Sequence, residues 1–390
     1  MPLPAGQSST LLIKSMITEL LKRFSVDQER GFLPNPDPFL ALHPQFEVWD
    51  ELGAEMPSLL AKGNFRLAVE NLPLIHADKL KDDSELDRAM LLLSMFANAY
   101  ISCDPDPVRK IPLALAVPLS EVAARSGRPP IASHASIVLN NWRRVNPKGP
   151  IELENLRTVQ NFLGGQDEEW FFLTTVAIES LGAPALSAVL DGLEAAASSN
   201  NKNFVDAIER IGNAINNCTN VLDRIPEKCA PHIFYSQIRP FLAGWPEEGI
   251  IYEGVSDEPK VYIGGSAAQS SLLQSIDAAM GIFHPHADSG PFLKKMRKYM
   301  PPAHRKFIEY LETQLSLKKY VEQNESRELN DALNSCISTL DSFRKKHMQI
   351  VVHYVLDQVK DEENVIGTGG TEFVAFLSRT RAETSENLIS

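Results

Sequence analysis

The chain has 390 residues, which is enough for about two domains of ordinary size. Hydrophobic residues make up 44% of it, the share of a globular protein, and this excludes a wholly disordered chain. The 38 basic and 50 acidic residues leave a net charge of −12, which argues against nucleic acid and anionic membranes as main partners, because phosphate binding needs positive contacts.

Helical spacing of apolar residues is the main pattern along the chain. It predicts helices over residues 10–24, 50–61, 84–101, 168–181, 185–197, 204–225, 269–282, 304–314 and 328–360. The clearest stripe places seven apolar side chains on one face at alternating spacings of four and three: Phe204, Ile208, Ile211, Ile215, Cys218, Leu222 and Ile225. Gly182 and Pro184 are expected to separate two of these helices, because both residues break helices.

Extended structure is predicted only over residues 111–117 and 250–263, the second interrupted by the sequence SDEP. Prolines concentrate in the connections of the first half, and residues 145–154 are the predicted domain boundary. We therefore expect a mainly α fold with two domains. Residues 1–150 would form a small helical domain with Pro-rich connections, and residues 151–390 a larger all-helical domain.

The cysteines and the apolar stretches indicate a soluble cytoplasmic protein. Four cysteines without a CxxC pair are too few for a disulfide framework and argue against a cysteine-held zinc or iron–sulfur site. The first residues lack the basic region and cleavage site of a signal peptide. The most apolar stretch, residues 89–101, is shorter than the ~20 residues that span a bilayer. No membrane partner is expected.

His347 occupies an apolar position on the stripe of the last long helix. Leu340 and Phe343 precede it at helical spacing, and Tyr354 follows. A neutral imidazole that faces a core needs a partner for its ring nitrogens. That partner is either a hydrogen-bonding group of the core or the iron of a haem, to which His347 would be an axial ligand.

Three further groups carry candidate chemistry. Arg239 stands among aromatic residues and is either a surface side chain or a buried clamp for a carboxylate. The small-residue run at 264–271 permits close backbone approach to a ligand, but it lacks a nucleotide-binding pattern. His284 and His286 are expected to be exposed polar residues. No acid–base or nucleophile motif appears.

Several segments, in collinear order, together resemble the indoleamine 2,3-dioxygenase family. They are GFLPNPDP (31–38), RPPIASHASIVLNNW (128–142), WFFLTTVAIE (170–179), FYSQIRPFLAGW (234–245), YEG (252–254), GGSAAQSSLLQSID (264–277), MRKYMPPAHRKFI (296–308), HMQIVVHY (347–354) and GTGGT (367–371). The matches run from about residue 30 to about residue 375, which is nearly the whole chain.

The resemblance implies a haem enzyme that adds both atoms of O₂ across the indole C2–C3 bond of L-tryptophan. The product would be N-formylkynurenine, the first step of the kynurenine and de novo NAD pathway. The cofactor would be haem b, ferrous in the active form, with related indoles also accepted and an unidentified electron donor. The C-terminal domain would hold the haem, the N-terminal domain would cap its distal side, and family precedent implies a monomer.

The resemblance also assigns roles to residues of this chain. The proximal iron ligand falls on His347, and an acid–arginine pair near the haem on Asp277 and Arg344. The carboxylate clamp falls on Arg239. The remaining substrate-pocket positions are Phe171, Phe234, Tyr235, Leu242, Gly265, Ser266 and Ala267, with the last three also against the haem. Thr368 matches a threonine of a mobile loop that closes over substrate. No residue is assigned as a catalytic acid or base.

Three pocket positions depart from the mammalian pattern. His134 stands where tyrosine is expected, Ile137 replaces a cysteine, and Thr175 replaces a serine. His134 either adds a distal hydrogen-bond donor or fills the same space. These changes leave open a family member with weak tryptophan turnover. A second alternative is a haem-binding or signalling protein without significant catalysis, although Tyr252 and Tyr354 offer no convincing signalling motif.

Overall fold

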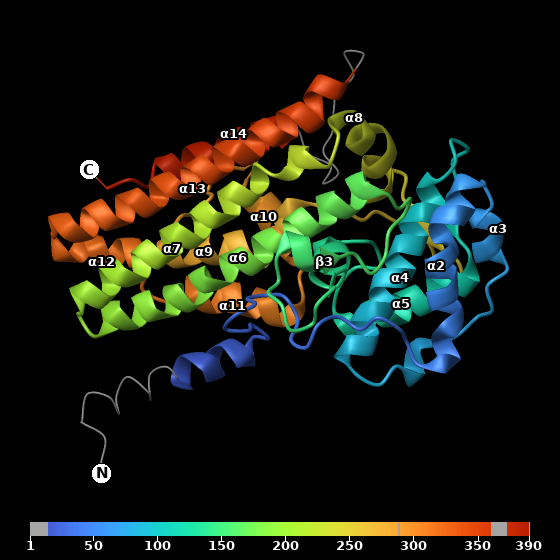
Figure 1. Ribbon diagram of the computed structural model, residues 1–390, viewed down its shortest axis with the longest axis horizontal. Helices are drawn as coiled ribbons and strands as arrows, with labels where there is room; N and C mark the ends of the chain where they lie inside the picture. Colours follow the sequence, from blue (N-terminus) through green and yellow to red (C-terminus); the bar gives the residue numbers. More distant parts are fainter. Residues whose placement is uncertain (1–14, 288, 360–372, 390) are drawn as a thin grey trace, which may run out of the picture.

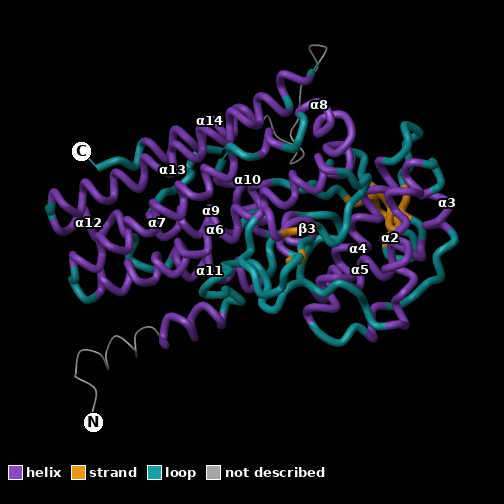
Figure 2. Tube along the Cα trace, viewed as in Figure 1, coloured by secondary structure: helices purple, strands orange, loops and turns teal. Residues whose placement is uncertain are grey.

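The structure, a computed structural model, describes residues 15–287, 289–359 and 373–389. It confirms the mainly α fold, and strands occupy only small areas (Figures 1 and 2). A helix over residues 15–23 lies within the first predicted one. The labelled α-helices are α2 (Glu47–Ala61), α3 (Phe65–Glu70), α4 (Asp83–Ser102), α5 (Leu113–Ser126), α6 (Gln166–Ala197), α7 (Asn201–Leu222), α8 (Pro231–Ile233), α9 (Ser271–Met280), α10 (Gly290–Arg297), α11 (Pro302–Glu312), α12 (Leu317–Asn324), α13 (Arg327–Tyr354) and α14 (Phe373–Ser385).

The long helices α6, α7, α13 and α14 run side by side (Figure 1), with α7 packed between α6 and α13, and α14 on α13. The helices α2 to α5 lie at the other end of the molecule. Residues 145–152 form a loop between the strands of a short antiparallel pair, β2 (Arg143–Arg144) and β3 (Leu156–Arg157). The division into domains at this loop stays a prediction.

The amphipathic helix predicted over 204–225 is confirmed as α7. Its apolar stripe is buried against α6 and α13. Asn200 precedes the helix and accepts a hydrogen bond from the backbone N–H of Asn203, which satisfies one of the unpaired amides at the helix start. Burial of the stripe, at about 1.5–3 kcal/mol per large apolar side chain, is what holds this long helix in place.

The predicted break at Gly182 and Pro184 is wrong, because α6 continues through both residues. A Cβ atom at Gly182 would lie 2.2 Å from Leu272 Cδ2, so this glycine serves the close approach of α9 and not a helix end. A proline inside a helix costs about 3 kcal/mol. The neighbours of Pro184 are buried along the helix, and their packing outweighs that cost.

Helix α6 is also the one described helix whose length and apolar composition would suffice to cross a membrane. Most of its apolar window is covered by other parts of the protein, and α7 and α9 pack on it. The apolar side chains of α6 are thus buried in the protein interior. The sequence analysis did not identify α6 as the most apolar helix, because it divided α6 into two shorter segments.

The strand predictions were confirmed only in part. Residues 113–117 belong to α5, and only β1 (Lys110–Ile111) is extended there. β1 pairs in parallel with β4 (Ile250–Tyr252), which pairs in antiparallel fashion with β5 (Ser256–Lys260). The SDEP sequence lies within β5 and does not interrupt it. Pro259 is tolerated because β5 is an edge strand, where one row of N–H groups needs no partner.

Several short turns and several helices were not predicted. Two π-helical turns span Ala135–Leu139 and Phe234–Ile238, and a 3₁₀ turn, Arg239–Leu242, follows the second. The helices α3, α5, α8, α10, α12 and α14 were also missed. The predicted helix over 328–360 ends earlier, at Tyr354, and a 3₁₀ turn, Leu356–Gln358, follows it. The mobile loop predicted around Thr368 lies outside the described residues.

Candidate functional site

A mostly apolar cavity of about 260 Å³ lies among α6, α13, α14, the turn at 234–242 and the loop at 264–270. Ten of the predicted site residues line it: His134, Phe171, Thr175, Phe234, Arg239, Leu242, Gly265, Ser266, Ala267 and His347. Four other predicted residues, Tyr235, Ile137, Asp277 and Arg344, do not line it. The fifth, Thr368, lies outside the described residues. The roles of all fifteen stay predictions.

His347 presents a neutral imidazole to this cavity. Burial, with a smaller contribution from the positive charge of Arg344, lowers the pKa of His347 to about 4, so the ring carries a free lone pair at neutral pH. His347 lines the cavity together with Ile350 and Val351 of the same helix. No hydrogen bond joins its ring to another residue of the described part of the chain, so the alternative of a hydrogen-bonded core histidine has no support there.

This donor set fits haem, whose ring supplies four of the iron ligands. Among the described residues, no three His, Cys, Asp or Glu side chains converge as ligands of a bare metal ion. One neutral imidazole in an apolar cavity instead suits a metal that brings its remaining ligands with it. His347 would hold the iron, and apolar side chains of α6, α13 and α14 line the cavity around it.

Aromatic side chains and one cation form the wall of the cavity near the turn at 234–242. The rings of Phe171 and Phe234 lie 4.6 Å apart between centroids, and Phe234 also meets the edge of Tyr354 at 5.8 Å. The Arg239 guanidinium lies 5.5 Å from the Tyr235 ring. Tyr235 therefore supports Arg239 from outside the cavity, and Arg239 supplies a positive charge to an otherwise apolar wall.

The loop at 264–268 approaches this wall very closely. Gly265 donates its backbone N–H to the carbonyl of Leu242 at 3.0 Å. A Cβ atom at Gly264 would lie 2.2 Å from that same carbonyl oxygen, so only glycine allows this contact. The side-chain oxygen of Ser266 accepts the N–H of Ala268 and caps the following turn. The backbone of the loop thus forms one side of the cavity.

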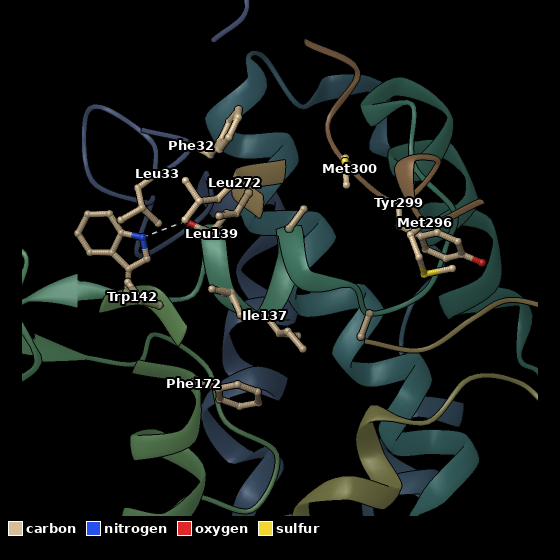
Figure 3. Close-up of a cluster of buried hydrophobic side chains, with 14 of the residues drawn as sticks. Phe32, Leu33, Ile137, Leu139, Trp142, Phe172, Leu272, Met296, Tyr299 and Met300 are labelled. Carbon is tan, nitrogen blue, oxygen red and sulfur yellow. Dashed lines mark hydrogen bonds between the residues drawn. The ribbon is translucent and has the colours of Figure 1, made fainter. Parts of the chain in front are cut away.

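Gln269 ties this loop to the π-helical turn that contains Ile137. Its Oε1 accepts the backbone N–H of His134 at 3.0 Å, and its Nε2 donates to the carbonyl of Gly264 at 2.8 Å. Ile137 lies in the buried apolar cluster above Phe172 (Figure 3). Its Cδ1 would be 3.1 Å from a Cβ at Gly265. Ile137 therefore supports the loop from behind and does not face the cavity.

His134 forms a buried polar group with Glu179 and Ser270. Its Nε2 lies 2.8 Å from Glu179 Oε1, and Ser270 donates its hydroxyl to the same oxygen at 2.6 Å. All three residues line the cavity. Thr175, one turn before Glu179 on α6, donates its hydroxyl to the carbonyl of Phe171 at 3.2 Å. The Nε2 of His134 is thus engaged by Glu179, and the role of His134 towards a substrate stays a prediction.

Asp277 and Arg344 form the predicted ion pair. The pair is largely buried and belongs to a larger cluster of charged side chains. Arg344 Nη2 donates to Asp277 Oδ2 at 2.6 Å. His284 lies between Asp277 Oδ2, at 3.2 Å, and Glu383 Oε2, at 2.7 Å. The prediction that His284 is exposed is wrong, since only 7% of its side chain is accessible. Arg344 also contacts Thr384 of α14.

Interactions between the charged side chains of this cluster determine the protonation of Asp277 and His284. Burial opposes ionisation of Asp277, but the charge of Arg344 and the hydrogen bond from His284 outweigh it and lower the pKa of Asp277. Burial likewise opposes protonation of His284, but Asp277 and Glu383 outweigh it and raise the pKa of His284. The cluster of Asp277, His284, Arg344 and Glu383 therefore pairs two negative with two positive side chains between α9, α13 and α14.

Sequence reasoning missed several residues of the site. Glu179 lies in a segment quoted for its resemblance but carried no separate signal, and Ser270 and Gln269 were taken only as parts of a loop. Phe292, Phe376 and Leu377 line the cavity from α10 and α14.

The tyrosines considered for signalling are both buried. Tyr252 donates its hydroxyl to Pro130, and Tyr354 donates to Cys229.

Comparison with known proteins gives one consistent answer. The family model described as indoleamine 2,3-dioxygenase matches residues 20–387. The chain is 34% identical to indoleamine 2,3-dioxygenase 2 of Mus musculus over 405 residues, covering 99% of this chain and 98% of that protein. It is 33% identical to the human indoleamine 2,3-dioxygenase 2, covering 97% of both chains. Identity is also 33% to indoleamine 2,3-dioxygenase of Saccharomyces cerevisiae, covering 94% of this chain and 93% of that protein.

Proposed function

The chain belongs to the indoleamine 2,3-dioxygenase family and is therefore a dioxygenase, and we propose that it adds both atoms of O₂ across the indole C2–C3 bond of L-tryptophan. The product is N-formylkynurenine. The observation that carries this proposal is the neutral His347 imidazole, without a hydrogen-bond partner among the described residues, in an apolar cavity that also contains Arg239 and Phe171.

The residues around the cavity have different roles in this reaction. His347 holds haem b through its ring nitrogen. The Arg239 guanidinium binds the carboxylate of tryptophan, because its planar fork matches two carboxylate oxygens. Phe171 and Phe234 pack against the indole, and the apolar side chains around them exclude water. Bound haem supplies the activation of O₂ and the oxidation of the ring.

The chain itself needs no acid or base for the net reaction. Both oxygen atoms enter the product, so no proton is consumed overall. The protein contributes the orientation of the indole and a dry cavity, which together raise the effective concentration of the reacting groups. This agrees with a cavity whose walls are mostly apolar.

The setting of the enzyme is also part of the proposal. We infer a cytoplasmic monomer that depends on a separate electron donor to keep iron ferrous. The four cysteines support a reducing compartment, because all of them are unbridged in the structure. The wider substrate range includes related indoles that carry a carboxylate for Arg239.

The test is to express the chain with haem supply, reduce it, add L-tryptophan under air and measure N-formylkynurenine. His347→Ala is expected to lose the haem Soret band and all product, because it removes the axial ligand. His353→Ala is the matched control, since His353 lies on the same helix but has an exposed ring near Asp357 and Tyr354 and does not line the cavity. Full haem content in His347→Ala would refute the assignment of the ligand.

A further inference from the structure

A positively charged segment of this acidic chain lies beside the cavity. Residues 290–308 contain six lysine or arginine residues and no aspartate or glutamate, whereas the whole chain has a net charge of −12. The segment forms α10 and the first part of α11. A local charge of opposite sign to the rest of the surface favours a partner that carries the complementary charge.

Two of the six cations are engaged within the protein. Arg297 donates to Gln274 Oε1 at 2.7 Å and pairs with Glu312 at 2.6 Å. Arg305 donates to the carbonyl of Gly127 at 3.1 Å. The other four are exposed and form no ion pair within the described part of the chain: Lys294, Lys295, Lys298 and Lys306. Their charges are therefore available to a partner.

Helix α10 presents different residues on its two sides. Phe292 and Met296 are one helical turn apart and point inwards, where Met296 is buried in the apolar cluster of Figure 3. Lys294 and Lys295 lie in the helix, and Lys298 directly follows it with helical backbone angles. Spacings of three and four residues place these three lysines on one shared, exposed face. We call them the lysine face of α10.

The inner side of α10 forms part of the cavity wall. The Phe292 ring lines the cavity and meets the edge of the Phe376 ring at 4.8 Å between centroids. Gln274 donates from Nε2 to the carbonyl of Leu293 at 3.4 Å, which attaches α10 to α9. The lysine face is thus separated from the cavity by the width of a single helix, about 10–12 Å.

A partner bound at the lysine face would lie near the haem of the proposed enzyme. His347 lines the same cavity as Phe292, so iron held by His347 would lie in the space behind α10. The proposed reaction requires ferrous iron and therefore a source of electrons. Electron transfer slows steeply with distance, so a carrier protein has to dock close to the cavity. Of the elements that line the cavity, α10 combines this closeness with unpaired positive charge.

We propose that Lys294, Lys295 and Lys298 form the docking surface for the electron donor, and that this donor is an acidic one-electron carrier protein. The reduced carrier loses one electron, ferric iron gains it and becomes ferrous, and no proton or bond is transferred. The proposal rests on the proposed function, because it assumes haem at His347. An anionic membrane fits less well, since a broad negative surface would also meet the negative charge of the rest of the chain.

The test uses a plant-type [2Fe–2S] ferredoxin as the probe, because it is acidic, strongly reducing and carries one electron. Calorimetry gives its dissociation constant for the haem-loaded protein, with both proteins oxidised. Anaerobic stopped-flow absorption at the Soret band gives the rate at which reduced ferredoxin converts ferric to ferrous haem. We expect binding and reduction both to weaken as the salt concentration rises, because ions screen the attraction between the two surfaces.

The triple variant Lys294→Glu, Lys295→Glu and Lys298→Glu should bind ferredoxin more weakly and be reduced by it about tenfold more slowly, or slower still, at low salt. The difference should shrink at about 1 M salt, where charges are screened within about 3 Å. Glutamine at the same three positions removes the charges without adding acids at the end of α10. It should change both quantities in the same direction by a smaller factor.

The matched control has the same change of net charge elsewhere on the surface. It combines Lys62→Glu after α2, Lys148→Glu in the loop between β2 and β3, and Lys202→Glu on α7, all at exposed positions that do not line the cavity. Its binding and reduction by ferredoxin should stay within about twofold of the unmodified protein, because screening limits the reach of distant surface charges. Reduced methyl viologen, a small cation that needs no docking surface, should reduce both triple variants at equal rates.

Four results would overturn the proposal. The first is no binding of ferredoxin to the unmodified protein at low salt, and the second is equal losses in the α10 variant and the control. The third is slower reduction by methyl viologen in the α10 variant alone, which would place the damage in the haem cavity. The fourth is binding of phosphatidylserine vesicles through the same lysines without binding of ferredoxin. Product formation by chemically reduced protein tests the proposed function separately, since it needs no carrier.

Discussion

At the scale of single residues, burial decides what each charged or titratable side chain at the site can do. Burial lowers the pKa of Arg239, with a partial offset from Tyr235, but the guanidinium keeps its positive charge at neutral pH. The charge of a largely buried guanidinium is poorly solvated, so a carboxylate from the substrate gains more there than it would at the surface. His347 shows the opposite outcome, since burial removes its charge and leaves it a neutral ligand.

Arg239→Ala should weaken the binding of L-tryptophan about thirtyfold to several thousandfold, because loss of one partner of a desolvated charge pair costs ~2–5 kcal/mol. Tryptamine lacks the carboxylate and should be affected far less. The measurement is the KM or Kd of both ligands. Arg109→Ala is the control, since Arg109 forms an exposed pair with Glu248. Equal losses for both ligands would contradict the clamp.

His304 should make the protein sensitive to acid. Burial lowers the pKa of His304 to about 3, although Ser25 opposes this shift. Since the folded pKa lies below the unfolded value of about 6.5, stability is fully present above that value and falls as the pH drops. The titration of His304 alone should lower the free energy of unfolding by ~3 kcal/mol between about pH 6.5 and about pH 4.5.

The measurement for His304 is the free energy of unfolding against pH, at constant haem content. His304→Leu should show a shallower fall below about pH 6.5, whatever its stability at neutral pH. An equally steep fall in the variant and in the unmodified protein would contradict the assignment. The ring of His304 packs at 4.6 Å against Phe32, so leucine keeps most of the apolar contact.

At the scale of elements, the cluster of Asp277, His284, Arg344 and Glu383 explains why α14 lies on α13. Helix α14 carries Phe376 and Leu377 into the cavity wall, so its position shapes the site. Glu383 is 4% accessible and contacts His284, Ser289 and the backbone of His286. The second pair between these helices, Arg381 with Asp341, is more exposed. The buried cluster is therefore the stronger attachment.

Glu383→Gln should destabilise α14 more than Asp341→Asn does. Removal of one partner from a buried ionic cluster costs ~3–5 kcal/mol, whereas a partly exposed pair contributes ~0–1 kcal/mol. The measurement is amide hydrogen exchange of residues 373–385. We expect much faster exchange in Glu383→Gln only, and similar rates in both variants would contradict this account.

The pH dependence of the same attachment follows from His284. Its folded pKa is raised, so its contribution is fully present below the unfolded pKa and is lost as the pH rises through the folded value. The protection factor of α14, which is its exchange rate relative to that of an unfolded amide at the same pH, should therefore fall on the alkaline side in the unmodified protein. In Glu383→Gln this fall should begin at lower pH, because one of the two carboxylates that hold the proton on His284 is gone.

At the scale of the whole molecule, one buried side chain connects the N-terminal helices to the site. Asn98 of α4 donates from Nδ2 to the carbonyls of Phe241 and Ala243, at 2.9 and 3.2 Å. Its Oδ1 accepts the backbone N–H of Ala132 at 3.1 Å. The turn that carries Arg239 and the segment that carries His134 are thus attached to the same position on α4.

Asn98→Leu keeps the size of the side chain but leaves three backbone groups without a partner. We expect a loss of about 3 kcal/mol or more in the free energy of unfolding, since each unpaired buried group costs about 1–3 kcal/mol. Weaker tryptophan binding should accompany it, because both attached segments carry residues of the cavity. Ser94→Ala on the same helix is the control, since Ser94 donates only to Leu91 within α4.

The sequence by itself determined the features that depend on local patterns, namely helix faces and family motifs. The spacing of apolar residues indicated the stripe of α7 and placed His347 on a buried face, because each helix repeats its environment every three to four residues. Collinear motifs indicated the family and ten residues that the fold brings to one cavity. Gly182 and Pro184 were misread because their local preference was considered without the packing of Leu272 on α6.

Only the tertiary structure decided which charged and polar groups meet. Glu179 and Ser270 are far apart in the chain, as are His284 and Glu383, and nothing in their own segments indicates the partner. Whether an ionisable side chain is paired, buried or neutral depends on what lies across the interface, through desolvation and Coulomb terms that have no sequence period. The buried polar group at the cavity and the attachment of α14 both depend on such contacts.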